Sequence, residues 1–458
     1  MKKKLLCTLI AAFFLLSLVG CNDSDGGGTG TGPGGQTTPN VSAEARHITI
    51  GTWYDQFYTS QHFDPFENPR VTNPFLAQMQ IDNMRRIETD YDITLEFVNL
   101  TWNGVQESIT TSIMAGMPDV DIYQADTQFG IPAVLSGFAI SLDAMMLDAT
   151  PEMARSFEDV FGDNDVMNNY NLAQDETFLF GSSISSGLPI YPLAFNLTMI
   201  EGLNLDNPQD LWDAGEWTWA AWREYLIAIT DTNANIYGWS GYWTNMLENL
   251  LFSNGTTIAS GPRTTIEDSA TIEVLELIYT IYNVDRTARP WVQENWEVNN
   301  NLYAQGLSGF FIGADWLFSE QGGGDLPFKI GVVPWPVGPS GSKETNLHGA
   351  TKGNWFFIPR GTENPALVFH VFFEWTNWYG WDREIAVDME WSQNNYMTER
   401  NFELAFFMSQ NTGFDIWGDL GVGDDLSMVP IMSGEYTGAQ YARSVSQVIQ
   451  DALDNFFG

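Results

Sequence analysis

The sequence is poor in basic residues. It carries 19 Lys and Arg residues against 58 Asp and Glu residues, which gives a formal net charge of −39 at pH 7. A surface of this sign repels nucleic acid and anionic lipid, and it disfavours an anionic ligand. The same charge would also serve solubility or a salty habitat. It therefore excludes some partners without naming one.

The sequence also lacks the common signatures of a metal site or a nucleophilic enzyme. Its four histidines include no pair at metal-ligand spacing, and no CxxC motif occurs. Neither a GxSxG nucleophile elbow nor a phosphate-binding P-loop is present. We therefore expect no metal and no cofactor. The histidines are His47, His62, His348 and His370.

The first 21 residues have the pattern of a processing signal. Residues 2–4 are lysines, residues 5–18 are largely apolar, and the LVGC that ends at Cys21 resembles the lipobox of bacterial lipoproteins. The apolar run is shorter than the roughly 20 residues that a membrane span needs, and an uncleaved anchor is the alternative. The resemblance implies a signal peptide over residues 1–20 and a lipidated, palmitate-bearing Cys21 on the outer face of the cell membrane. Cys7 is then removed, so the fold has no disulfide and depends on its own core.

A flexible tether follows the signal. Residues 21–45 are rich in Gly, Thr, Pro and Asn and have few apolar residues that could pack. The rest of the chain is long enough for two domains of ordinary size, and no further stretch resembles a membrane span. The composition is 44% hydrophobic and includes 18 tryptophans, more than core filling alone would require.

Residues 109–130 predict a helix end, a break, a strand and an open loop. Ile109 and Ile113 share one helical face, and the helix should stop at the Gly and Pro of residues 116–118. A short apolar run over residues 120–123 suits a buried parallel strand, and polar residues with one aromatic follow it at 126–130. Open α/β sheets bind ligands at such strand ends.

Strand and helix patterns alternate through the start of the body. A strand around Ile48 and Ile50 precedes a loose helix over residues 76–87 and a second strand over 93–98. This order predicts a parallel sheet with right-handed crossovers. Further on, Thr218 is a plausible N-cap, and Trp219 and Trp222 recur at helical spacing, so we expect both in the core. Other expected elements are helices at 270–282, 367–379 and 441–456 and a strand at 307–312.

Several blocks of sequence resemble, in the same order, those of one family. The blocks are AGMPDVDIY, SSGLPIYPLAFNLTMIEGLNL, DLWDAGEWTWAAWREYLIAIT, YAQGLSGFFIGADW, KIGVVPWPVGPSG and FFIPRGTENPALVFHVFFEW. Together with the lipobox they resemble the family 1 extracellular solute-binding proteins of carbohydrate ABC transporters. The resemblance implies an α/β, two-lobed periplasmic-binding-protein-like fold of type II. Each lobe would be a mainly parallel sheet flanked by helices, with a hinge between the lobes.

The resemblance also implies how the chain divides. Lobe 1 would comprise residues 46–184 and 346–400, and lobe 2 residues 185–345 and 401–458. The hinge would lie near residues 182–186, near residues 340–347 and near Arg400. The implied protein is a monomeric, non-enzymatic receptor that captures a carbohydrate between the lobes and delivers it to the transmembrane subunits of an ABC permease.

A sugar-binding cleft needs aromatic rings against the sugar face and amides or carboxylates around its rim. Trp53, Asp55, Trp243 and Trp355 are candidates because each follows or ends a strand-like run. Five further candidates sit where members of the family commonly place ligand contacts: Asp126, Gln128, Phe195, Trp316 and Trp391.

Two alternatives stay open. An extracellular glycosidase needs only two suitably spaced carboxylates and aromatic residues, and 58 acidic residues offer many such pairs. A binding protein of the same fold could also take a peptide or another non-sugar solute.

Overall fold

The computed structural model describes most of the body of the chain. The described residues are 46–55, 64–67, 74–162, 176–181, 191–291, 302–312, 326–349, 355–379, 398–409, 411–413 and 426–457. Three predicted functional residues, Cys21, Trp316 and Trp391, lie outside these ranges, as does the predicted hinge segment at 182–186. Among the described helices, none is long and apolar enough to cross a membrane.

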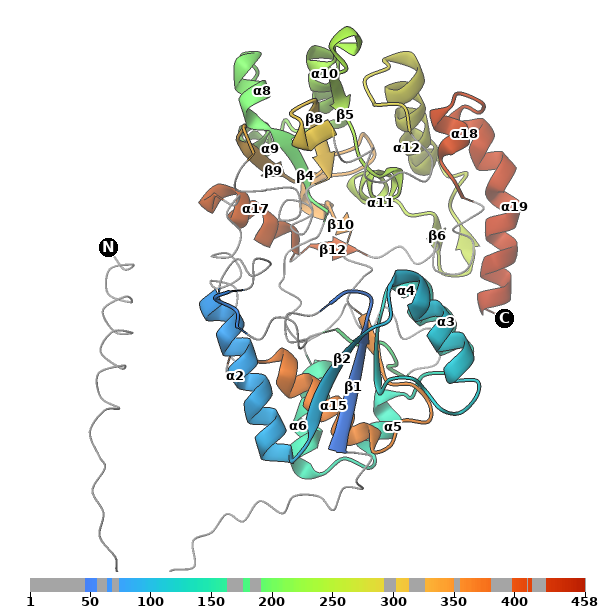
Figure 1. The fold of residues 1–458 in the computed structure, drawn as a ribbon. Helices are drawn as coiled ribbons and strands as arrows, with labels where there is room; N and C mark the ends of the chain where they lie inside the picture. Colours follow the sequence, from blue (N-terminus) through green and yellow to red (C-terminus); the bar gives the residue numbers. More distant parts are fainter. Residues whose placement is uncertain are drawn as a thin grey trace, which may run out of the picture. The chain divides into compact units, whose positions relative to one another are not determined.

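The first sheet has four strands in the order β11-β3-β1-β2. Its strands are β1 (His47–Thr52), β2 (Thr94–Asn99), β3 (Ile122–Ala125) and β11 (Trp355–Phe357). β1 is parallel to both neighbours, with Ile50 opposite Phe97 and Ile122, whereas β11 is antiparallel to β3. The parallel sheet predicted from the alternating pattern is therefore confirmed for this part of the chain (Figure 1).

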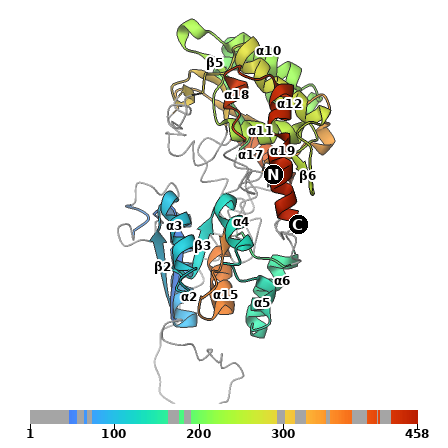
Figure 2. The same ribbon diagram turned by 90° about the vertical axis from the view of Figure 1, so that its right-hand side faces the viewer.

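Helices cover both faces of the first sheet. Figure 2 shows α3 on one side and α15, with α5 and α6, on the other. α15 also packs against α2 and α6. The predicted helix stop is confirmed, since α3 ends at Ser112 and Gly116 has a φ of 73°. The helices are α2 (Pro74–Tyr91), α3 (Trp102–Ser112), α4 (Thr127–Leu135), α5 (Leu142–Met146), α6 (Pro151–Gly162) and α15 (Pro365–Thr376).

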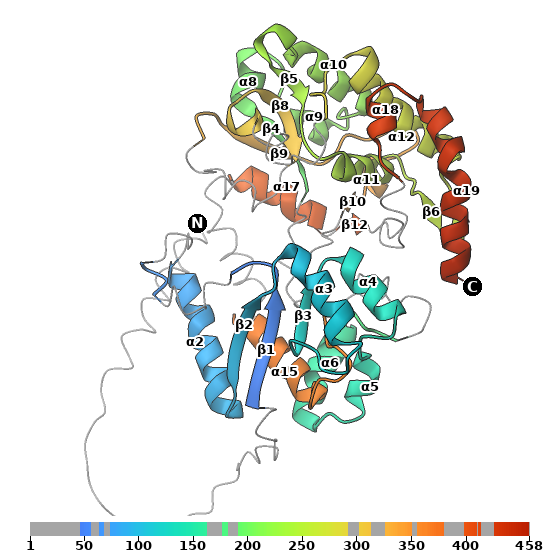
Figure 3. The same ribbon diagram turned by 45° about the vertical axis from the view of Figure 1, so that its right-hand side comes forward.

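The second sheet is mixed, which corrects the expectation of a mainly parallel sheet in both halves. Its order is β5-β8-β4-β9, and β4 runs antiparallel to both β8 and β9, while β5 and β8 are parallel (Figure 3). The single reversed strand thus lies inside the sheet, whereas in the first sheet it lies at the margin. The strands are β4 (Leu193–Asn196), β5 (Tyr237–Trp239), β8 (Ser308–Ile312) and β9 (Ile330–Val333).

The helices around the second sheet follow local signals in the sequence. Thr218 caps α10 as predicted, because its Oγ1 accepts a hydrogen bond of 3.3 Å from Ala221 N, and Trp219 and Trp222 are buried in the core. The helices are α8 (Leu197–Gly202), α9 (Pro208–Ala214), α10 (Trp219–Ile229), α11 (Trp243–Ser253), α12 (Ser269–Tyr279), α17 (Glu399–Ser409), α18 (Val429–Met432) and α19 (Gly438–Phe457). Short pieces complete the described fold: β6 (Ala259–Ser260), β7 (Arg263–Thr264), β10 (His348–Gly349), β12 (Thr412–Gly413), two 3-10 turns at Thr232–Ala234 and Lys343–Thr345, and a π-helical turn at Thr280–Val284 that continues α12.

Two hydrophobic cores account for most of the buried apolar residues. The first draws its buried residues from 48–180 and 355–373, and the second from 193–335 and 404–453. Residues 346–349, expected in lobe 1, hydrogen-bond to residues around the second core. Asn346 Nδ2 donates to Trp335 O over 2.9 Å, and Gly349 N donates to Asn249 Oδ1 over 2.9 Å. The chain therefore returns to the first core only after Gly349.

A side chain of α17 completes one margin of the second sheet. Asn401 is 1% exposed, and its Nδ2 donates to Ile330 O of β9 over 3.1 Å. Its Oδ1 accepts from Val332 N over 3.0 Å and from Gln209 Nε2 over 2.8 Å. The amide thus hydrogen-bonds backbone groups that the edge strand β9 would otherwise leave unpaired.

Candidate functional site

Aromatic side chains gather where the three parallel strands of the first sheet end. Trp53 follows β1, Trp102 follows β2 as the first residue of α3, and Phe129 lies in the first turn of α4 after β3. The ring centroids of Trp53 and Trp102 are 5.3 Å apart, and those of Trp102 and Phe129 are 5.0 Å apart. Tyr54 adds a fourth ring, 6.1 Å from Trp53. We call Trp53, Tyr54, Trp102 and Phe129 the aromatic cluster.

The aromatic cluster is partly open to solvent. Trp102 is 41% exposed and Tyr54 is 42% exposed, whereas Trp53 and Phe129 are half-buried and pack against the first core. The Trp53 and Trp102 rings meet edge to face, at an interplanar angle of 83°. Exposed indole faces held by a packed base can stack against an apolar or C–H-rich ligand surface.

Polar side chains lie beside the aromatic cluster. Asn99, the last residue of β2, donates from Nδ2 to Asp55 Oδ1 over 3.0 Å, and both residues are exposed. The Asn99 Oδ1 accepts from Thr101 N over 2.9 Å. One amide therefore ties the loop after β1 to the end of β2, so a carboxylate and a carboxamide lie at the same strand ends as Trp53 and Trp102.

Asp126 and Gln128 form the start of α4. Asp126 is the N-cap, and its Oδ1 accepts from Gln128 N and from Gln128 Nε2, both over 3.1 Å. The capping role that competes with a binding role is thus present for Asp126. Gln128 is exposed and lies one residue before Phe129, so its amide is available at the border of the aromatic cluster.

A second aromatic group lies where β5 ends. Tyr242 and Trp243 follow β5 and are half-buried against the second core, and Tyr242 lies 6.5 Å from Trp291 between ring centroids. Gly241, before them, has a φ of 152°, and a Cβ there would lie 3.0 Å from Ile312 Cγ1. The close approach to Ile312 leaves no room for a side chain at this turn.

Two of the predicted site residues belong to the cores. Phe195 has no exposed surface, and a Cβ on Gly331 would come within 2.0 Å of its ring. Trp355 is 6% exposed and is part of the first core. A buried ring offers little or no surface to a ligand, so neither residue joins the candidate site in this structure.

The candidate site contains residues that were not selected from the sequence. The structure adds Trp102 and Asn99 to Trp53 and Asp55, and it adds Tyr242 and Trp291 to Trp243. Phe129 is the aromatic residue of the loop predicted after the strand at 120–123. The signal was also available for Trp102 and Tyr242, because each follows a strand just as Trp53 does.

A pocket of about 510 Å³ opens at the opposite, amino-terminal end of the first sheet. His47, Asp121 and Glu363 are among its lining residues, and none of them belongs to the aromatic cluster. The Asp121 Oδ2 already accepts from Thr49 N and Thr49 Oγ1, both over 2.9 Å. The pocket has no aromatic wall apart from an imidazole, so the aromatic cluster is the better candidate.

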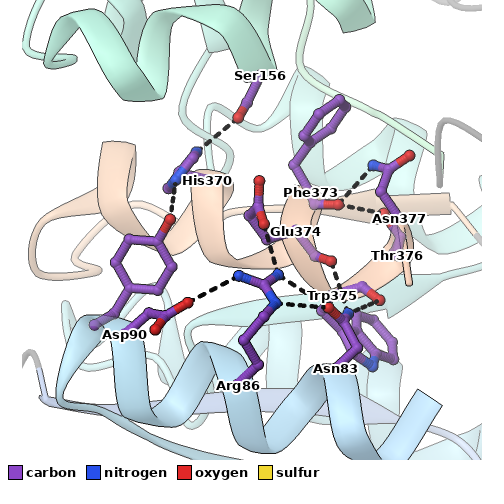
Figure 4. Close-up of polar contacts among 11 residues, drawn as sticks. Asn83, Arg86, Asp90, Ser156, His370, Phe373, Glu374, Trp375, Thr376 and Asn377 are labelled. Atoms are coloured by element: carbon purple, nitrogen blue, oxygen red, sulfur yellow. Dashed lines mark hydrogen bonds and ion pairs between the residues drawn. The ribbon is translucent and has the colours of Figure 1, made fainter. Parts of the chain in front are cut away.

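A buried serine and histidine resemble a nucleophile and base but link helices. Ser156 Oγ of α6 lies 2.7 Å from Nδ1 of His370 in α15, and Tyr91 OH of α2 lies 2.7 Å from His370 Nε2 (Figure 4). Ser156 is 2% exposed and His370 is 3% exposed. Burial lowers the pKa of His370 and raises the pKa of Tyr91, which favours the neutral form of both side chains. No substrate can reach this serine in the structure described.

An ion pair extends this contact between helices. Arg86 of α2 binds Glu374 of α15 over 2.7 Å and Asp90 over 3.0 Å (Figure 4). Asn83 Nδ2 donates to Glu374 O over 2.9 Å. Among the described residues, no group of His, Cys, Asp and Glu could hold a metal ion.

The family follows from comparison with known proteins. The family model of bacterial extracellular solute-binding proteins matches residues 85–378, more than half of the chain. The chain belongs to this family. The matched range contains Trp102 and Phe129, most of the first core and much of the second.

The curated relatives share part of this length. Proteins described as binding proteins in Brucella abortus strain 2308 and Brucella suis biovar 1 are each 27% identical over 268 residues, which is 55% of this chain and 58% of theirs. The chain therefore spans little more than half the length of the curated relatives it matches.

Solved structures show the same fold over nearly the whole chain. An ABC substrate-binding protein of Listeria monocytogenes, solved with cycloalternan, is 14% identical with a TM-score of 0.61, covering 89% of this chain and 99% of that one. A Thermotoga lettingae solute-binding protein, solved with α-D-tagatose, is 15% identical with a TM-score of 0.60, covering 89% and 99%. UgpB of Mycobacterium tuberculosis, solved with glycerophosphocholine, is 14% identical with a TM-score of 0.62, covering 89% and 98%. The fold is that of the two-lobed periplasmic binding proteins.

Proposed function

We propose that this solute-binding protein captures an uncharged sugar or oligosaccharide outside the cytoplasm and delivers it to an ABC importer. The observation that carries the proposal is the aromatic cluster at the carboxyl ends of β1, β2 and β3, with Asp55 and Asn99 hydrogen-bonded beside it. Indole faces suit the C–H face of a sugar ring, and amide and carboxylate groups suit its hydroxyls.

The charge of the chain supports an uncharged ligand. A net charge of −39 disfavours the approach of an anionic solute. The solved structures of similar fold hold both sugars and glycerophosphocholine, so the fold alone does not choose the ligand. The choice of carbohydrate is supported by the aromatic and amide groups of this chain.

A ligand screen tests the proposal directly. Thermal unfolding would be followed with mono- and oligosaccharides, amino acids, short peptides and glycerophosphocholine as a non-sugar control. We expect a neutral carbohydrate to raise the unfolding temperature in a concentration-dependent way, because a ligand that binds only the native state stabilises it. Isothermal calorimetry on the best ligand would give its affinity. A shift with peptides or glycerophosphocholine alone would contradict the proposal.

The proposed mechanism is closure of two lobes around the ligand. The sequence predicts lobe 1 at residues 46–184 and 346–400 and lobe 2 at residues 185–345 and 401–458. We propose these lobes with residues 346–349 assigned to lobe 2, which the hydrogen bonds of Asn346 and Gly349 support. A ligand that touches both lobes only when they are closed shifts the population toward the closed state. Small-angle scattering should show a smaller radius of gyration with saturating sugar. An unchanged radius would contradict closure.

Trp316 and Trp391 remain proposed contacts of the same site. The family resemblance of the sequence implies both as ligand contacts, and both lie outside the described residues. Trp316→Ala should lower sugar affinity about tenfold, as expected for losing one aromatic platform. Calorimetry that finds the same affinity in a folded variant would remove Trp316 from the site.

We also propose that the protein acts as a monomer without catalysis and is held at the membrane by a lipid on Cys21. Incubated oligosaccharide should be recovered uncut by chromatography, and cleavage would instead support the glycosidase alternative.

Cys21→Ser should abolish labelling by a palmitate analogue and release the protein into the soluble fraction. Continued labelling of that variant would contradict the anchor.

A further inference from the structure

Thr101 adopts a backbone conformation that suits glycine. Its φ is 63° and its ψ is 159°, between the end of β2 and the start of α3. The other described residues with positive φ, apart from glycines, are Asp92, Asn204, Asn235, Arg286 and Asn364. Asn and Asp tolerate positive φ, but a β-branched residue in this region is an outlier whose backbone is strained.

Hydrogen bonds on both sides hold this conformation in place. Leu100 N, just before it, donates to Thr52 O over 2.8 Å, and Thr101 N donates to Asn99 Oδ1 over 2.9 Å. After it, Val105 N donates to Thr101 O over 3.1 Å, and Gly104 N donates to Thr101 Oγ1 over 3.3 Å. The strain persists because neighbouring contacts determine the backbone from both directions.

The strained residue directly precedes the most solvent-exposed tryptophan of the aromatic cluster. Trp102 begins α3, so the direction in which its side chain leaves the backbone depends on the turn made at Thr101. At that turn the Trp102 ring contacts both Trp53 and Phe129 while 41% of the residue stays exposed. An extended backbone at residue 101 would change the path into α3 and with it the orientation of the ring.

We infer that Thr101 is a positioning residue, whose strained backbone fixes the Trp102 ring in the orientation that stacks on the ligand. The inference rests on the proposed function for the identity of the ligand. A glycine would adopt these angles without strain, but it would also allow many others and so leave the ring less fixed. Threonine gives a cap to α3 and restricts the turn at a cost in stability.

The test is Thr101→Gly, with Thr101→Ser and Asn204→Gly as controls. We expect Thr101→Gly to raise the unfolding temperature by about 2 °C, because relief of strain exceeds the loss of the cap. Its sugar affinity should fall about fivefold, which corresponds to about 1 kcal/mol. Thr101→Ser keeps the hydroxyl and a Cβ, so its affinity should match that of the wild type. Asn204→Gly changes a positive-φ residue that follows α8, far along the chain from the aromatic cluster, and should leave affinity unchanged.

A measurement without ligand separates this inference from the proposed function. In protein labelled with 5-fluorotryptophan, Trp102→Phe would assign the ¹⁹F resonance of Trp102. That resonance should be single and narrow in the wild type and broadened or split in Thr101→Gly. An unchanged line would overturn the inference, as would a lower unfolding temperature, or unaltered affinity for a sugar that the wild type binds. A wild type that binds no carbohydrate would overturn the proposed function, and the ¹⁹F result would still decide the role of Thr101.

Discussion

Tryptophan serves different purposes at the two hydrophobic cores. In the second core, Trp222, Trp239 and Trp335 form a triangle of rings whose centroids are 5.6–6.0 Å apart, and none of the three has exposed surface. At the end of the first sheet, the ring centroids of Trp53 and Trp102 are a similar 5.3 Å apart, yet Trp102 is 41% exposed. Similar ring geometry thus stabilises a core in one place and provides an open surface in the other, and exposure distinguishes them.

The largest expected effect comes from breaking the buried triangle. Trp222→Ala should lower the free energy of unfolding by about 3–5 kcal/mol, because it leaves a large cavity in a packed core. Urea unfolding followed by circular dichroism would measure this. A loss below about 1 kcal/mol would show that these three rings contribute little to the stability of the second core.

Buried and exposed asparagines extend the comparison. Asn401→Ala should lower the free energy of unfolding by about 2–3 kcal/mol, because it strands the buried Gln209 amide and backbone groups of β9. Asn99→Ala removes an exposed amide, so we expect a change within about 0.5 kcal/mol and weaker sugar binding. Equal losses of stability in urea unfolding of the two variants would contradict the contrast.

Trp102→Ala should affect binding more than stability. We expect sugar affinity to fall at least about tenfold, which corresponds to 1–2 kcal/mol for a lost aromatic platform. Phe457→Ala is a matched control, because Phe457 is 42% exposed at the end of α19 and far along the chain from the aromatic cluster. Calorimetry that finds equal affinities for the two variants would remove Trp102 from the site.

The last prediction concerns a buried histidine beside the second core. Burial lowers the pKa of His348 to about 3, below its usual value near 6.5, so the folded state holds the neutral form. Its contribution to stability is present above pH 6.5 and is lost as pH falls toward 3, by up to about 1.4 kcal/mol per pH unit. His348→Phe should reduce the slope of unfolding free energy between pH 6 and 4.5. An unaltered slope would show that other groups take up the protons.

The sequence predicted helices and caps better than it predicted whether an aromatic ring is buried or exposed. Thr218 and the spacing of Trp219 and Trp222 were sufficient for α10, because a cap and a helical period are both local. The burial of Phe195 could not be predicted, because β4 is buried at all four positions and a strand without exposed residues shows no alternation.

Features set by long-range pairing could not be read from the sequence. The reversed direction of β4 depends on β8 and β9, which begin more than 100 residues later. The return to the first core after Gly349 depends on a two-residue pairing with β12. The expectation that ligands bind at strand ends did locate Trp53, Asp55, Asp126 and Gln128 at the carboxyl ends of the parallel strands of the first sheet, since parallel strands end together.

The amide of Asn401 has a consequence for self-association. β9 is an edge strand of the second sheet, and unpaired backbone groups on an edge strand are a template for aggregation. Because α17 supplies Asn401 to Ile330 O and Val332 N, those groups of β9 are not available to another molecule. A single buried side chain thus covers part of an edge at which another copy could otherwise add a strand.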